Sequence, residues 1–141
     1  MIVEEIIGRL RELAMPPFAL VDGAAALAAL VDQPLAVPAA YVFIKEEVSA
    51  DNERMMGVLQ RTEVDIAVVI IAGNVSDAIG AAGASDLEPL KAAMRAHLVG
   101  WQPPSAADAI THIGGQLIRN RAGRVWWEMT LGTAFYIEGE D

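Results

Sequence analysis

A stretch near the C-terminus, residues 124–137, constrains the fold more than any other part of the chain. It reads Arg-Val-Trp-Trp-Glu-Met-Thr-Leu-Gly-Thr-Ala-Phe-Tyr-Ile, and alternate positions from Val125 to Ile137 are apolar except for Thr133. This period of two is typical of a β-strand that buries one face, while the intervening positions form a mixed face. Its 14 residues exceed the usual strand length of about 3–10. We therefore expect a bend or bulge at Gly132.

Three further segments predict strands of the same sheet. Residues 39–44 are apolar on both faces, which indicates a strand inside the sheet rather than at its edge. Residues 58–71 are rich in β-branched side chains and predict a second long strand. This strand would pair antiparallel with 41–47 through a long connection. Residues 116–119 predict a short strand that a hairpin turn, with Gly123 at positive φ, joins to the strand from Arg124.

Helical periodicity and capping signals predict helices beside this sheet. Residues 2–14 carry an apolar stripe at helical spacing, and 24–31 predict a short alanine-rich helix. A further helix begins at Asp86 as N-cap, which places Pro89 in the first turn, where its missing N–H costs nothing. Gly100 ends that helix. We expect an α+β fold: one domain over 1–141, with a central, mostly antiparallel sheet and flanking α-helices.

Composition excludes several classes of protein. The net charge is −9, from 19 acidic and 10 basic side chains, which disfavours a general nucleic-acid binder because phosphates attract Lys and Arg. The chain has no cysteine, so it has no disulfide or thiolate chemistry and fits a reducing compartment. We expect no membrane association, because no apolar run reaches the ~18 residues of a membrane span, and no secretory signal.

The sequence shows no motif of a catalytic, cofactor-binding or metal site. His97 and His112 are the only histidines, and no cluster of His, Asp and Glu has the spacing of metal ligands. Glycine-rich segments at 80–83 and 114–115 lack the lysine and the strand–helix context of phosphate-binding loops. We therefore expect a protein that is not an enzyme and uses no cofactor or metal.

Basic and aromatic side chains near the C-terminus are candidates for an interface. Three arginines cluster at the predicted hairpin, either as a solvated turn or as a docking point for an acidic surface. Trp126 and Tyr136 lie on the mixed strand face, either covered by a helix or within a subunit interface, where aromatics are enriched. With a tryptophan that follows the third helix, the candidate subunit or partner interface is Arg119, Arg121, Arg124, Trp126, Tyr136 and Trp101.

Several segments together carry a resemblance to a known family. Pro38-Ala39-Ala40-Tyr41-Val42 stands at a strand start, and Gln60 lies at the opening of the next strand. A helix ends in Leu98-Val99-Gly100-Trp101-Gln102-Pro103, followed by Gly114-Gly115-Gln116-Leu117 and then by Val125-Trp126 with an aromatic strand. In this order, from about Pro38 onward, the chain resembles the tail terminator family of long-tailed bacteriophages, the U-like minor tail proteins.

The resemblance implies an α+β subunit of a virion. Such subunits form a hexameric ring on the head-proximal end of the tail tube, stop tube polymerisation and present a surface for head joining. The implied partners are further copies of the chain, the tail tube protein and a head-completion or connector protein. DNA would pass through the ring lumen without specific binding, in line with the acidic charge. Assembly would take place in the host cytoplasm.

A second class of function remains open beside this one. The chain would then be a small α+β ligand-binding or regulatory domain, possibly oligomeric, which a thermal shift with a metabolite panel would reveal. Residues 74–85 are unusually rich in Ala and Gly for the resembled family, and predict a loop that is partly helical. For the ring, we expect Trp126→Ala or Arg121→Glu to impair assembly while leaving the monomer folded.

Overall fold

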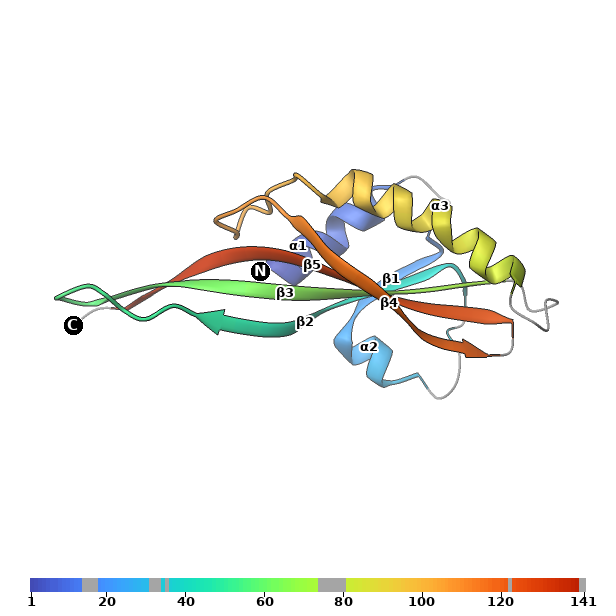
Figure 1. Cartoon of the computed structure of the whole chain (residues 1–141), viewed down its shortest axis with the longest axis horizontal. Helices are drawn as coiled ribbons and strands as arrows, with labels where there is room; N and C mark the ends of the chain where they lie inside the picture. Colours follow the sequence, from blue (N-terminus) through green and yellow to red (C-terminus); the bar gives the residue numbers. More distant parts are fainter. Residues whose placement is uncertain (14–17, 31–33, 35, 74–80, 122, 140–141) are drawn as a thin grey trace.

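A computed structural model describes the chain over residues 1–13, 18–30, 34, 36–73, 81–121 and 123–139. Within these residues the strands form a five-stranded sheet of order β1-β2-β3-β5-β4. Figure 1 shows α1 and α3 over one face of the sheet and α2 on the other. In chain order the elements are α1 (Ile2–Arg11), β1 (Leu20–Gly23), α2 (Ala24–Ala28), β2 (Ala39–Ser49), β3 (Val58–Gly73), α3 (Ala81–Leu98), β4 (Thr111–Arg121) and β5 (Arg124–Gly139).

The sheet is mainly antiparallel, as predicted. β1 pairs parallel with β2, whereas β2–β3, β3–β5 and β4–β5 are antiparallel. The apolar run at 39–44 lies in β2 between β1 and β3, which confirms its interior position. Gly123 has φ 73° in the turn between β4 and β5, so the predicted hairpin is also confirmed. These agreements confirm the α+β fold class.

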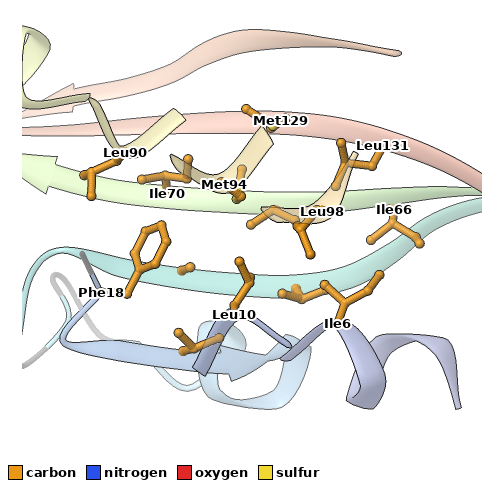
Figure 2. Packing of buried hydrophobic residues seen from close by; sticks show 14 of the residues in the cluster. Ile6, Leu10, Phe18, Ile66, Ile70, Leu90, Met94, Leu98, Met129 and Leu131 are labelled. Carbon is orange, nitrogen blue, oxygen red and sulfur yellow. The ribbon is translucent and has the colours of Figure 1, made fainter. Parts of the chain in front are cut away.

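The main hydrophobic core lies between the sheet and the helices α1 and α3. Its members are fully buried apolar side chains that follow the helical and strand periods of the sequence, and Figure 2 shows them facing one another. Burying one such side chain stabilises the fold by about 1.5–3 kcal/mol. They include Ile6 and Leu10 of α1, Met94 and Leu98 of α3, Ile66 and Ile70 of β3, and Met129 and Leu131 of β5.

A smaller cluster fills the opposite face of the sheet. Tyr41, Val69 and Trp126 are buried there, with Leu27 of α2 and Leu30 just after it packed against them. Because both faces are covered in this region, the strands lose the simple alternation of buried and exposed positions. This explains why the strand from Arg124 buries residues from its mixed face as well.

Helix α3 begins earlier than predicted. It starts at Ala81 rather than after Asp86, so Pro89 lies inside the helix and not in its first turn. The alanine-rich sequence from Ala81 favours helix, and packing of the apolar face further along outweighs the proline. Residues 74–80 of the predicted loop lie outside the described residues. The predicted end is confirmed, because Gly100 follows the helix with φ 90°.

Strand β4 is longer than predicted, and the predicted bulge at Gly132 is absent. β4 starts at Thr111 rather than at residue 116, and irregularities lie between His112 and Gly114 and between Leu117 and Arg119. The β3–β5 register runs through Gly132 without a shift. A Cβ at residue 132 would stand 2.9 Å from Cδ1 of Ile113, so that the end of the exposed Ile113 side chain would have to move.

Strands β2, β3 and β5 continue past the helices and form a projection, which we call the arm. It consists of residues 46–63 and 136–139, and Figure 1 shows it extending beyond the helices. At about 3.3 Å per residue, the 16 residues of β3 span roughly 50 Å, more than the helices cover. The loop at the arm's tip carries Met55 and Met56, which are 101% and 74% exposed.

Candidate functional site

The predicted arginine cluster lies at the turn between β4 and β5, which we call the hairpin end. Arg121 and Arg124 are paired across the turn, and the Arg121 side chain lies outside the described residues. The Arg119 guanidinium carbon lies 4.9 Å from the centroid of the Trp126 ring, a cation–π distance. Nη1 of Arg124 donates a hydrogen bond of 3.1 Å to the Pro34 carbonyl. Arg119 and Arg124 therefore brace this end and bring positive charge to it.

A groove of about 290 Å³ opens between α2 and β4, beside the hairpin end. Arg119 and Glu128 are its charged residues. Glu128 lies 3.4 Å from Nζ of Lys45 and accepts a 3.0 Å hydrogen bond from Gln116. Glu128 is thus held by Lys45 and Gln116, and Arg119 adds a guanidinium to the same rim. The apolar lining consists of Leu27, Leu30, Phe43, Val69, Ile118 and Trp126.

Trp126 is less accessible than an interface residue would be. Its side chain is 8% exposed and packs against Tyr41 and Ile71. Of the two alternatives for this residue, the structure favours the covered one, because the segment of α2 lies over it. Trp126 nevertheless contributes to the lining of the groove. Because Trp126→Ala would open a cavity, we expect it to destabilise the monomer in addition to any effect on assembly.

Tyr136 lies in the arm, away from the hairpin end. It is 50% exposed and neighbours Arg61, which forms an ion pair with Asp108. The Asp108 carboxylate and then the Tyr136 hydroxyl raise the pKa of Arg61, while the Arg61 guanidinium lowers the pKa of Asp108. Oγ1 of Thr133 donates a 2.7 Å hydrogen bond to the Asp108 carbonyl. These contacts tie the base of the arm to the loop before β4.

Trp101 lies at the junction of α1 and α3. The Arg9 guanidinium carbon lies 4.7 Å from the centroid of its ring. Nε of Arg9 donates to the His97 carbonyl at 3.1 Å, and Nε2 of His97 lies 2.9 Å from the Arg9 carbonyl oxygen. Trp101 and His97 therefore serve the packing of the two helices.

The six candidate residues thus fall in three separate places: the hairpin end, the arm and the helix junction. Sequence reasoning missed the tip of the arm with Met55 and Met56. A signal for it exists in the strand from Val58, where residues 60–63 are all polar or charged, in contrast to the continuous apolar run of residues 66–71. Such a polar segment cannot be buried on both faces of the sheet, as residues 66–71 are.

A second, more apolar groove of about 270 Å³ lies where α1 begins. Ile44, Val64 and Phe135 line it from the sheet, and Glu4 and Glu47 give it an acidic rim. Among the described residues, no three His, Cys, Asp or Glu side chains could together hold a metal ion. No helix in the described part of the chain is long and apolar enough to cross a membrane.

Comparison with known proteins shows the family to which this chain belongs. No curated protein matches the sequence. A chain from the structure "Virion of native gene transfer agent (GTA) particle" shares the fold, with 19% identity and a TM-score of 0.58 over 95% of this chain and 92% of that one. The model of the phage tail terminator protein family matches residues 1–140. The chain therefore belongs to the phage tail terminator protein family and is a structural protein of phage tails.

Proposed function

We propose that this protein forms a hexameric ring that caps the head-proximal end of the tail tube. The ring ends tube polymerisation and provides the surface to which the head is joined. The single observation that carries this proposal is the family match over residues 1–140. The proposed role is structural, without catalysis and without a cofactor, in the assembled virion.

The shape of the subunit supports assembly through unlike surfaces. The arm and the hairpin end lie at opposite ends of the molecule (Figure 1). Contacts between unlike surfaces of identical subunits generate rings when the rotation closes. The arm also exposes Val48, Tyr136 and Ile137, at 58%, 50% and 40%. Large exposed apolar side chains of this kind are candidates for contact with a partner.

The remaining partners follow from the same proposal. One face of the ring contacts the tail tube protein, and the other contacts a head-completion or connector protein. The net charge of −9 supports a lumen that repels the DNA backbone, so that DNA passes without binding. Neutralising the acidic residues that face the lumen is then expected to slow DNA ejection, and an unchanged rate would remove this part of the proposal.

Deletion of the gene from the phage tests the proposed function. Electron microscopy of the resulting particles is expected to show overlong tails and unattached heads. Supplying the wild-type gene in trans should restore tail length and head attachment, which controls for effects on neighbouring genes. Tails of normal length joined to heads in the deletion strain would overturn the terminator role.

A simple assay distinguishes the alternative, a ligand-binding role, from the proposed structural role. A small-molecule site would raise the melting temperature of the purified protein with at least one member of a metabolite panel. We expect no such shift for a ring-forming structural protein. A reproducible shift, together with normal tails in the deletion strain, would replace the structural proposal by a regulatory one.

A further inference from the structure

The tip of the arm is a defined loop that displays two methionines. Oδ1 of Asn52 accepts a 3.0 Å hydrogen bond from the Leu59 amide, and Nδ2 of Asn52 donates a 3.1 Å hydrogen bond to the Gly57 carbonyl. These bonds close the loop around Met55 and Met56, whose side chains are 101% and 74% exposed. Methionine is flexible and polarisable, which suits it to fill a groove on a partner.

Opposite charges lie at the two ends of the subunit. The tip loop carries Asp51 and Glu53 against one arginine, Arg54. The strands behind it add Glu46, Glu47, Glu63 and Glu138 against Arg61, which is paired with Asp108. The other end of the molecule carries the arginines of the hairpin end. An elongated subunit with an acidic tip and a basic opposite end is electrostatically suited to head-to-tail association with copies of itself.

Charge complementarity also chooses between the two grooves. The groove at the start of α1 has Glu4 and Glu47 at its rim, which would repel an acidic tip. The groove between α2 and β4 has Arg119 at its rim, and its Glu128 is already paired with Lys45. Like charges placed against each other suppress a wrong pairing, and opposite charges favour the right one.

We propose that the arm tip of one subunit docks into the groove between α2 and β4 of the neighbouring copy. Met55 and Met56 lie on the apolar lining near Leu30 and Ile118, and the acidic side chains of the tip face Arg119. The inference rests on the proposed ring and names its subunit contact. Each subunit gives its tip to one neighbour and receives the tip of the other, which is a heterologous contact.

The absence of native cysteine allows a direct test by disulfide cross-linking. Particles are produced with Met56→Cys and Ile118→Cys in the same chain and are then mildly oxidised. A ladder of covalent oligomers ending at the size of the closed ring is expected on a non-reducing gel, and reductant should remove it. The matched control pairs Met56→Cys with Ile44→Cys in the other groove and is expected to give no ladder.

A charge exchange provides a second test that does not depend on disulfide geometry. Glu53→Arg and Arg119→Glu are each expected to reduce incorporation of the protein into particles by about tenfold. The two changes together should restore incorporation, because the opposite charges again face each other. Glu4→Arg, the same change at the rim of the other groove, is expected to leave incorporation unchanged.

These outcomes separate the docking contact from the terminator role. Absence of the Met56–Ile118 ladder and of charge rescue, in particles with normal tails, would overturn the contact while the ring proposal stands. A ladder from the Met56–Ile44 pair, or a cross-link from residue 56 to the tail tube protein, would overturn it equally. Failure of the terminator role would appear instead as normal tails after gene deletion.

Discussion

Gly115 of β4 lies beneath the indole of Trp127 on β5. A Cβ on residue 115 would stand 2.7 Å from Nε1 of Trp127, closer than real Cβ contacts allow. Nζ of Lys91, on α3, lies 3.9 Å from the centroid of the same ring. The absence of a side chain at Gly115 therefore leaves room for the Trp127 ring beside α3, which explains a glycine at this position of the strand. The neighbouring Gly114 has no atom within 4 Å of its Cβ position.

These two glycines give a matched pair of substitutions. Gly115→Ala is expected to lower the free energy of unfolding by about 1–3 kcal/mol, because the added methyl group must displace the Trp127 ring. Gly114→Ala is expected to be neutral or slightly stabilising, since its Cβ enters open space. Urea denaturation of the two variants measures the difference. Equal effects would contradict the packing of Trp127 on Gly115.

Trp126 and Tyr136 are expected to respond differently to truncation. Trp126→Ala should destabilise the protein by about 3–5 kcal/mol, because it removes a buried aromatic ring from the cluster under α2. Tyr136→Ala should cost about 1 kcal/mol or less, because its side chain is half exposed. Denaturation curves followed by circular dichroism provide the measurement. A Trp126→Ala variant as stable as the wild type would place Trp126 on the surface after all.

Pro89 tests where α3 begins. In a helix that starts at Ala81, Pro89→Ala restores an interior N–H and is expected to stabilise the protein by about 1–3 kcal/mol. In a helix capped by Asp86 the same change would have little effect, because the first-turn N–H has no partner within the helix. The control is Pro104→Ala, at an exposed position outside any helix, with an expected effect within about 1 kcal/mol. If Pro89→Ala left the stability unchanged, α3 would begin near Asp86, as predicted from the sequence.

The Arg61–Asp108 ion pair is expected to make stability depend on acid pH. Arg61 lowers the folded-state pKa of Asp108. The Asp108 carboxylate therefore stabilises the fold at pH values above its ordinary, unfolded-state pKa of about 3.9. This contribution is lost as the pH falls through the lowered folded pKa. The difference in melting temperature between wild type and Asp108→Asn should therefore be present at pH 7 and disappear at strongly acid pH. In an Arg61→Gln background, Asp108→Asn should produce no such pH-dependent difference.

Much of the fold was predictable because its signals are local. The apolar stripe of α1 and the strand patterns from residues 39, 58 and 124 each follow from the period of one element. The tight turn at Gly123 likewise needed only its neighbours in sequence. The errors arose where distant segments decide the outcome. Gly114 and Gly115 indicate a break when read alone, yet they belong to a strand because Trp127 fills the space above residue 115.

The candidate site was predictable only in part, for the same reason. The basic hairpin end follows from three arginines around one turn. The groove beside it requires α2, the start of β2 and the middle of β4 to converge, and no local pattern specifies that. The position of Trp101 at the helix junction, in contact with Arg9, likewise depends on the packing of α1 against α3 and not on a local pattern.

The long strands from residues 39, 58 and 124, the hairpin at Gly123 and the family follow from the sequence alone, since periodicity and short motifs are properties of contiguous residues. The tertiary structure alone decided which strand faces are covered and which project. Trp126 is buried because α2, about a hundred residues away in sequence, packs over it. Met56 is exposed because β2 and β3 run past the helices that would have covered it. Burial depends on which surfaces meet, and that is settled by packing between distant segments rather than by the pattern within any one of them.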